Sequence, residues 1–181
     1  MKSGLRLLLV DDNPADVGLA REALAKSVRN SEITSVEDGM EAMAFLDRRG
    51  KHASATRPDL VILDLSLPKK DGLAVLAAIK ARPELRRIPV VIFSTSQLAK
   101  DIARSYDLGA NCYVNKPGNL KDFFSAVKSI EEFWCGFVNL PRQENESSWI
   151  RKLRKYCSLK ITRATRTWFA CDWSKGNLRL T

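Results

Sequence analysis

The feature that most constrains the fold of this chain is a regular alternation of short apolar runs with helical patterns. Four runs are apolar enough to be strands buried on both faces of a sheet, and a fifth, over residues 32–36, is weaker. The runs are Leu5–Val10, Glu32–Val36, Asp59–Leu63, Pro89–Phe93 and Asn111–Val114. Each is followed by apolar residues at helical spacing. Right-handed crossovers convert such a string into one doubly wound, five-stranded parallel sheet covered by helices on both faces.

Turn and cap residues indicate where several of the helices begin and end. Pro14 stands near the start of the first predicted helix, where its missing N–H costs nothing. An Asp71-Gly72 turn precedes the third helix. Gly109 closes the fourth helix, and the side chain of Asn119 is a candidate N-cap for the fifth.

The charge of the chain is unevenly distributed along its 181 residues, which carry a net charge of +9. Residues 1–142 account for +3 of this charge, and residues 143–181 account for +6. We therefore expect a globular domain over residues 1–142 and a short basic C-terminal extension over residues 143–181. Any contact with nucleic acid or another anionic surface has to depend on that extension.

Several protein classes are excluded by composition. The longest apolar runs, Leu7–Val10 and Val90–Phe93, are far shorter than the ~18 to 20 residues that span a bilayer. The first of them runs into acidic residues, so it cannot be the core of a signal peptide. The four cysteines include no Cys-x-x-Cys pair, and the single histidine leaves no ligand set for structural zinc. We expect a cytoplasmic protein.

Polar residues follow the predicted strands at the edge where ligands bind in open parallel sheets. The groups that meet there are Asp11-Asp12, Asp64, Ser94-Thr95-Ser96 and Asn115-Lys116-Pro117. Three neighbouring carboxylates repel one another and favour a hard cation such as Mg²⁺. Lys116 adds a compact positive charge suited to a phosphoryl oxygen. This combination is typical of phosphoryl transfer to a carboxylate.

The ordered set of motifs resembles the receiver domain of two-component response regulators over residues 5 to about 140. The matching segments are Leu8–Pro14, Leu67-Pro68, Asp71-Gly72, Pro89–Ser94, Gly109-Ala110 and Tyr113–Pro117. The resemblance implies a flavodoxin-like fold. More narrowly, the chain is similar to the single-domain regulators that serve phytochrome-type histidine kinases. The segments that carry this likeness are Asn13–Val17, Arg57–Asp59, Leu67–Gly72, Ser105–Tyr113 and Ser129–Trp134.

The resemblance implies a role for each acidic residue. Asp64 would accept a phosphoryl group from the phosphohistidine of a sensor kinase. Asp12 would bind Mg²⁺ directly, Asp11 would do so largely through water, and the Ser66 carbonyl would complete the protein ligands. The chain would catalyse its own phosphorylation and slow hydrolysis, and would not be an enzyme with a diffusing substrate.

The resemblance also implies a conformational switch. Ser94 would bond the aspartyl phosphate, Lys116 would pair with it, and Tyr113 would be the rotameric partner. Consecutive hydroxyls leave the register open, with Thr95 as the alternative to Ser94, because side chains on a strand alternate faces. A cis Lys116–Pro117 bond is expected as well. Phosphorylation would then shift a pre-existing equilibrium of conformations.

The fifth predicted helix, Asn119 to Val138, is longer than the sheet that it covers. It would extend ~30 Å at 1.5 Å per residue, whereas a strand of this sheet extends only ~17 to 20 Å. The last turns carry Phe133, Trp134 and Phe137 beyond the sheet. Exposed aromatic residues on that scale indicate an interface. We expect a homodimer through this helix, which the narrower resemblance also implies.

The extension departs from the pattern of the small regulators, which normally end before it, and two interpretations stay open. In one, the chain is a DNA-binding transcription regulator. The residues that would contact nucleic acid are Arg151, Lys152, Arg154, Lys155, Trp149, Trp168 and Trp173. In the favoured one, the extension packs on the core, mediates assembly or has no selected role. A phosphatase of the haloacid-dehalogenase type is disfavoured, because Ser66 stands where such enzymes need a second acid.

Overall fold

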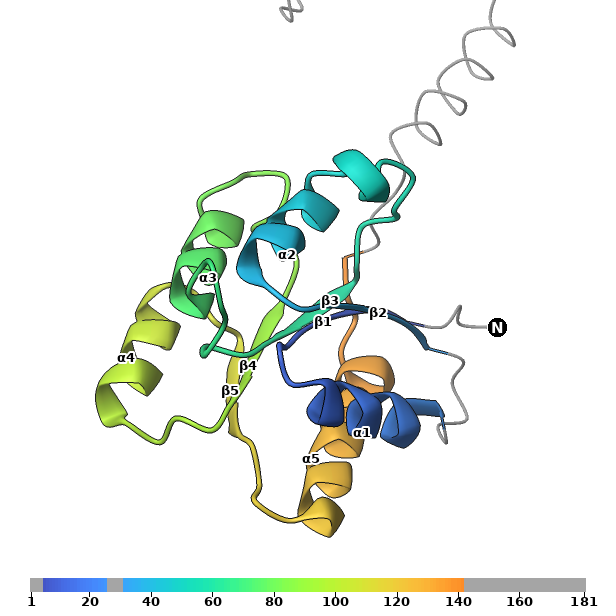
Figure 1. Cartoon of the computed structure of the whole chain (residues 1–181), viewed down its shortest axis with the longest axis vertical. Coiled ribbons are helices and arrows are strands. Elements are labelled where there is room, and N and C mark those ends of the chain that lie inside the picture. Colours follow the sequence, from blue (N-terminus) through green and yellow to red (C-terminus); the bar gives the residue numbers. More distant parts are fainter. Residues whose placement is uncertain (1–4, 26–30, 142–181) are drawn as a thin grey trace, which may run out of the picture. The chain divides into compact units, whose positions relative to one another are not determined.

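The computed structural model describes residues 5–25 and 31–141, which contain a single five-stranded sheet (Figure 1). The strand order is β2-β1-β3-β4-β5, and every neighbouring pair is parallel. The strands are β1 (Arg6–Val10), β2 (Glu32–Val36), β3 (Leu60–Leu63), β4 (Val90–Ser94) and β5 (Cys112–Asn115). The predicted doubly wound sheet is confirmed, and each predicted run ends within about one residue of its strand. The predicted extension lies outside the described residues.

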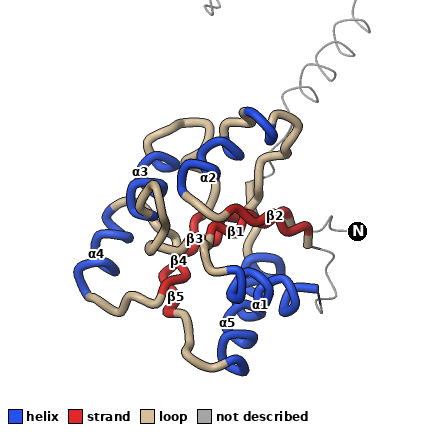
Figure 2. The backbone as a smooth tube through the Cα atoms, in the orientation of Figure 1, coloured by secondary structure: helices blue, strands red, loops and turns tan. Residues whose placement is uncertain are grey.

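Helices cover both faces of the sheet. Figures 1 and 2 show α1 and α5 on one face and α2, α3 and α4 on the other. The helices are α1 (Pro14–Ala25), α2 (Gly39–Leu46), α3 (Gly72–Lys80), α4 (Ala99–Asp107) and α5 (Leu120–Glu132). A 3₁₀ turn, Gly50–His52, follows α2. No helix within the described ranges is long and apolar enough to cross a membrane.

Alternate residues of each central strand contribute to two separate apolar layers. Leu8 and Val10 of β1 pack against α2 and α3, whereas Leu7 and Leu9 pack against α1 and α5. Strands β3 and β4 are buried on both faces in the same way, which explains why their sequences are continuous apolar runs. Burial of each such aliphatic side chain contributes ~1.5 to 3 kcal/mol of transfer free energy.

The predicted helix ends are observed in three places. The Asn119 carboxamide oxygen caps α5 by accepting a hydrogen bond from the Asp122 N–H at 2.9 Å. Asp71 caps α3 through the Leu73 N–H at 3.4 Å. Gly109 follows α4 with φ +92°, the left-handed conformation that glycine adopts without a Cβ clash.

The fifth helix ends earlier than the sequence predicts. The α-helical hydrogen-bonding pattern ends at Glu132, and Phe133–Phe137 form a wider π-helical turn before Val138 becomes extended. Phe133 and Phe137 are exposed, by 53% and 82%. The predicted overhang of aromatic residues is therefore correct for these two side chains.

The expected exposure of Trp134 is wrong. This side chain is only 9% exposed and belongs to the core cluster that includes Phe123 and Ile130 of α5. The physical reason is its position in the stripe of apolar residues, which repeats at intervals of four and three along the inner face of α5. Trp134 is the next member of that stripe, so it covers the sheet and is not available as an exposed interface residue.

Candidate functional site

The pairing of β1 with β3 brings two of the predicted carboxylates together. Val10 pairs with Leu63 at the carboxyl ends of these strands, so the next residues, Asp11 and Asp64, lie side by side. Both are buried, with 2% and 5% exposure, whereas Asp12 is exposed. One carboxylate oxygen from each of the three lies within 4.8 Å of the others. The sequence predicted this cluster from the strand ends alone.

Lys116 enters the cluster from β5, two strands away from β3. Its backbone N–H donates to the Ser94 carbonyl at 2.8 Å, which fixes the chain after β5. Its Nζ donates to Asp11 Oδ2 at 2.7 Å and to Asp64 Oδ2 at 2.6 Å. The lysine side chain is 4% exposed, so the ammonium neutralises the carboxylates in a site that excludes most water.

Asp16 also contacts this lysine, which sequence reasoning did not anticipate. Its Oδ2 accepts a hydrogen bond from Lys116 Nζ at 3.0 Å. Asp16 lies in the first turn of α1, where a negative charge is favoured by the helix dipole. That preference is the sequence signal that could have drawn attention to it.

The ionisation of the three central groups is coupled. Burial is the largest influence on each of them and disfavours the charged form. At Asp11 burial prevails, and the pKa is raised. At Asp64 the hydrogen bond and charge of Lys116, together with Ser94 and the Ser66 N–H, outweigh burial and lower the pKa. For Lys116 the two carboxylates outweigh burial and raise the pKa.

The hydroxyls after β4 differ sharply in their environment. Ser94 is fully buried, and its hydroxyl lies near enough to Asp64 to help lower the pKa of that carboxyl. Thr95 is exposed. Of the two alternatives for the switch hydroxyl, Ser94 is the one that lies against the acidic cluster.

Tyr113 of β5 reaches the loop after β4 from the other side. Its hydroxyl donates to the Ser96 carbonyl at 2.8 Å. The ring is half-buried, and burial raises the pKa of the phenol. Tyr113 is therefore linked to the segment that follows Ser94 and not to the carboxylates themselves.

The loop after Asp64 folds tightly around that residue. The Ser66 N–H donates to Asp64 Oδ1 at 3.1 Å, and the Gly72 N–H donates to the Leu65 carbonyl at 3.1 Å. A Cβ on Gly72 would lie 2.3 Å from the Asp64 carbonyl oxygen, so only glycine allows this close approach. Ser66 itself is exposed, beside the carboxylate that its N–H holds.

One geometric expectation is not met. No peptide bond within the described ranges is cis, so Lys116–Pro117 is trans and the cis prediction is wrong. Lys116 reaches both buried carboxylates from the trans bond.

The donor set fits a hard divalent cation. Carboxylate and carbonyl oxygens are the ligands that such ions prefer, and the cluster combines two buried carboxylates with an exposed one that leaves room for water. The same edge holds a buried ammonium and a buried hydroxyl, which can bond phosphoryl oxygens. The arrangement can therefore bind a metal and a phosphoryl group next to one another.

Comparison with known proteins agrees with this geometry. Residues 7–128 match the response regulator receiver domain family. Response regulator Rcp1 of Synechocystis sp. is 49% identical over 135 residues, which cover 75% of this chain and 92% of that protein.

Solved structures show the same likeness. The phosphorylated cyanobacterial phytochrome response regulator RcpA is 54% identical, with a TM-score of 0.75 over 77% of this chain and 99% of that chain. The Mn²⁺-bound form of Rcp1 is 48% identical, with a TM-score of 0.74 over 76% of this chain and 99% of that chain. With its parallel sheet, its carboxylate cluster and these relatives, this chain belongs to the response regulator receiver family and is related to phytochrome response regulators.

Proposed function

We propose that this protein receives a signal by accepting a phosphoryl group on Asp64 from a sensor histidine kinase. The observation that carries the proposal is the contact of one buried ammonium, Lys116 Nζ, with both Asp11 and Asp64 at 2.7 and 2.6 Å. This contact supports the proposal because the site gathers negative charge and supplies a cation to offset it. A transferring phosphoryl group needs the same compensation.

The metal in this proposal is Mg²⁺, held by Asp11, Asp12, Asp64 and the Ser66 carbonyl. Its contribution would be to neutralise charge on the phosphoryl oxygens and on the carboxylates. The three carboxylate oxygens within 4.8 Å support such a site. The Mn²⁺-bound form of Rcp1, a relative with 48% identity, supports a divalent ion.

The residues of the chain would share the transfer as follows. An oxygen of Asp64 attacks the phosphorus of the phosphohistidine, an O–P bond forms, and the P–N electron pair leaves with the imidazole. The low pKa of Asp64 keeps the acceptor ionised at neutral pH. Lys116 bonds an oxygen of the transferred group, so charge stays balanced as the aspartyl phosphate forms.

Ser94 and Tyr113 would convert phosphorylation into a change of conformation. The Ser94 hydroxyl, which lies beside Asp64, would turn to an oxygen of the aspartyl phosphate. That movement pulls on the segment after β4, where Tyr113 holds the Ser96 carbonyl. Phosphorylation would thereby shift the population of conformations in the β4–α4 region, because the new bonds exist in one state only.

Replacement of Asp64 by asparagine is expected to abolish phosphorylation, because an amide cannot accept the phosphoryl group. The measurement is phosphorylation by acetyl phosphate in the presence of Mg²⁺, detected as an increase in the mass of the intact protein. The matched control is Asp122→Asn, an exposed carboxylate in the first turn of α5. Equal labelling of the Asp64→Asn variant and the wild type would show that Asp64 is not the phosphoryl acceptor.

The upstream partner in this proposal is a phytochrome-type histidine kinase, and the site of action is the cytoplasm. The relatives support this class of kinase, because RcpA is a phytochrome response regulator. Both RcpA and Rcp1 are similar to this chain over about three quarters of its length. The protein would act through protein contacts. Its only catalysis would be on itself, in acceptance and slow hydrolysis of the phosphoryl group. Phosphotransfer profiling against the sensor kinases of the source organism would identify the partner.

We further propose a homodimer through the end of α5. Phe133 and Phe137 are exposed by 53% and 82%, although such side chains gain free energy when they are buried. The double variant Phe133→Ser/Phe137→Ser is expected to weaken dimerisation at least tenfold, as measured by analytical ultracentrifugation of phosphorylated and unphosphorylated protein. Leu98→Ser, a change of the exposed apolar residue at the start of α4, is the control. A wild type that stays monomeric at micromolar concentration in both states would contradict this prediction.

The domain division at residue 142 is also a proposal. The last described element ends at Phe137, and the alternative of DNA binding depends on residues that lie outside the described part of the chain. A gel shift at low salt that disappears when the chain is cut after Arg142 would favour the alternative.

A further inference from the structure

The loop between β3 and α3 controls the orientation of the proposed phosphoryl acceptor. Asp64 Oδ2 is held by Lys116 at 2.6 Å, and Asp64 Oδ1 is held by the backbone N–H of Ser66 at 3.1 Å. The second bond depends on the path of the loop, because the direction of the backbone N–H of Ser66 is set by the conformation of the loop backbone. Whatever fixes the loop therefore also fixes the direction of the carboxylate.

The tip of this loop is bonded to the neighbouring loop that precedes α2. Lys69 Nζ donates to Asp38 Oδ2 at 2.6 Å. Asp38 is 7% exposed, and its other oxygen caps α2 by accepting a hydrogen bond from the Glu41 N–H at 2.7 Å. Asp38 is thus immobilised by the helix, and the pair fastens the loop to a rigid element.

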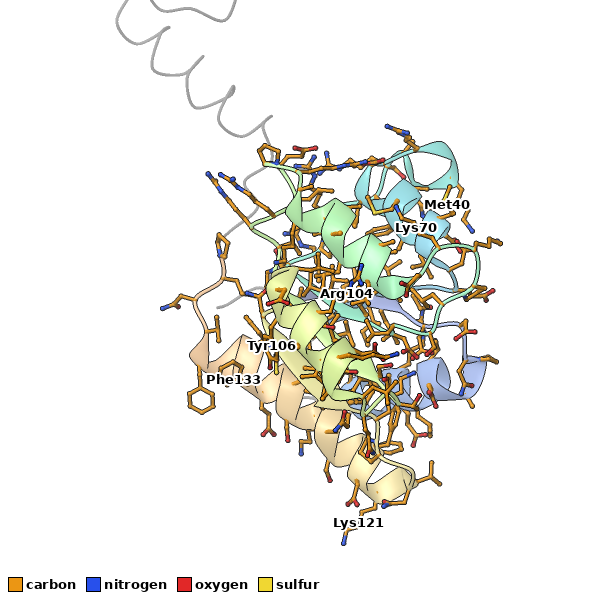
Figure 3. The ribbon with its side chains drawn as sticks, turned by 90° about the vertical axis from the view of Figure 1, so that its left-hand side faces the viewer. Met40, Lys70, Arg104, Tyr106, Lys121 and Phe133 are labelled. Atoms are coloured by element: carbon orange, nitrogen blue, oxygen red, sulfur yellow. The ribbon has the colours of Figure 1, made fainter. Side chains whose placement is uncertain are left out.

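Two further features show that the loop has an unusual backbone conformation and is tightly packed. Lys69 has φ +62°, a left-handed conformation that side chains other than glycine adopt rarely. The next residue presses against α2, since a Cβ on Gly39 would lie only 2.4 Å from the Lys70 carbonyl oxygen. Figure 3 shows Met40, the residue after Gly39, beside Lys70. The loop and the start of α2 are therefore in close van der Waals contact, which leaves no room for an added methyl group at Gly39.

We propose that Asp38 and Lys69 are positioning residues for the phosphoryl acceptor. Their ion pair keeps the loop closed so that the Ser66 N–H holds Asp64 in the orientation that the metal and the phosphoryl donor require. This inference rests on the proposed function, but neither residue touches the metal or the phosphoryl group. The pair acts only through the loop, as outer groups do when they orient metal ligands.

The sign of the effect separates positioning from simple electrostatics. Lys69 is a cation in the loop that follows Asp64, so loss of its charge would by itself reduce the repulsion of Mg²⁺ and strengthen Mg²⁺ binding. Loss of the loop's attachment would weaken Mg²⁺ binding, because the ligands lose their pre-set geometry. The two causes act in opposite directions, and Lys69→Met distinguishes them.

The test is calorimetric titration of the full chain with Mg²⁺, together with the rate of phosphorylation by acetyl phosphate at low and at saturating Mg²⁺. Lys69→Met is expected to weaken Mg²⁺ binding about three- to fivefold, as for loss of a partly exposed ion pair. The rate at saturating Mg²⁺ is expected to fall less than about twofold, because bound metal restores the geometry. Lys69→Arg keeps the charge and is expected to bind Mg²⁺ like the wild type.

Lys51→Met is the matched control. Lys51 is as exposed as Lys69, at 73% against 68%, and it pairs with Glu41 in the first turn of the same helix. Within residues 5–25 and 31–141, the ion pair that Lys51 forms is with Glu41 and not with the β3–α3 loop, so its loss is expected to leave Mg²⁺ binding unchanged or slightly tighter. Gly39→Ala is a second variant that displaces the loop without a change of charge, and it is expected to weaken Mg²⁺ binding more than Lys69→Met.

Unchanged or tighter Mg²⁺ binding by Lys69→Met would overturn the inference, as would equal weakening by Lys69→Met and Lys69→Arg. These results differ from failure of the proposed function, in which the wild type itself takes up neither Mg²⁺ nor label. A wild type that does both, with variants that differ in the expected order, supports the positioning role.

Discussion

Replacement of Lys116 by methionine is expected to destabilise the metal-free protein by about 3 to 5 kcal/mol, the usual cost of removing one partner from a buried ionic cluster. The ammonium donates to Asp11, Asp16 and Asp64 from a side chain that is 4% exposed. Methionine is similar in length but donates no hydrogen bond. It would therefore leave two buried carboxylates, at 2% and 5% exposure, facing one another without compensation.

Divalent metal is expected to recover a large part of this loss. A ligand that binds only the folded state adds ~2.7 kcal/mol to its stability at a hundred times the dissociation constant. The variant should gain more than the wild type, because the metal then supplies the charge that the lysine no longer provides. The measurement is urea unfolding in EDTA and in Mg²⁺, with Lys121→Met as the control. Lys121 is exposed near the start of α5 (Figure 3).

Phosphorylation should not recover in the same way. Mg²⁺ can neutralise the carboxylates, but it does not replace the hydrogen bond from Lys116. One oxygen of the transferred phosphoryl group would therefore have no donor in the variant. Loss of one such preorganised donor costs about 10²- to 10³-fold in rate. A Lys116→Met variant that is as stable as the wild type in EDTA, or is phosphorylated at the wild-type rate, would contradict this account of the site.

The pH dependence gives an independent check with a definite sign. In the wild type the pKa of Asp64 is lowered from 3.8, so its stabilisation is present above that value and is lost as the pH falls through the folded pKa. The pKa of Lys116 is raised from 10.5, so its stabilisation is present below that value and is lost as the pH rises through the folded pKa. Without the ammonium the pKa values of Asp11 and Asp64 both rise. The stability gap between wild type and Lys116→Met should then narrow as the pH falls from about 7 to about 4, because the carboxyls of the variant take up protons at a higher pH than those of the wild type.

The carboxylate cluster could be predicted because it follows from topology alone. Parallel strands place their carboxyl ends at one edge, so Asp11, Asp64 and Lys116 had to lie near one another once the strands were recognised. The strand limits were equally accessible, because the central strands are apolar throughout and end where the first polar residue appears.

Contacts between separate loops could not be predicted in this way. The pair of Asp38 and Lys69 joins residues 31 positions apart, and its formation depends on a left-handed backbone at Lys69 that no residue preference indicates. The contact of Asp16 with Lys116 depends on how α1 sits on the sheet. Such contacts follow from the packing of whole elements, which periodicity along the chain does not specify.

The end of α5 illustrates a further limit of periodicity. Apolar spacing correctly identified the stripe that contains Phe123, Val127 and Ile130, but it could not locate the last residue that the sheet still reaches. Trp134 falls on the buried side of this boundary, and Phe137 falls on the exposed side. The change to a π-helical turn at Phe133–Phe137 alters the angular step between residues, so helical spacing no longer applies there.

Replacement of Trp134 by alanine is therefore expected to destabilise the folded domain by about 3 to 5 kcal/mol, the cost of emptying a buried aromatic site. The indole packs in the cluster between the sheet, α1 and α5, with the Phe133 ring against it in an edge-on arrangement at 5.5 Å between centroids. An alanine leaves a cavity that the surrounding strands, fixed by their hydrogen bonds, cannot close.

Phe137→Ala is the matched aromatic control, since this ring is 82% exposed. Its removal should change the unfolding free energy of the monomer by less than about 0.5 kcal/mol. The measurement is urea unfolding of both variants at a protein concentration low enough to keep each monomeric, because association would add stability that depends on concentration. If Trp134 acted only in a dimer interface, its replacement would leave monomer stability unchanged. A monomer that loses several kcal/mol with Trp134→Ala and almost none with Phe137→Ala assigns the first ring to the core and leaves the second free for association.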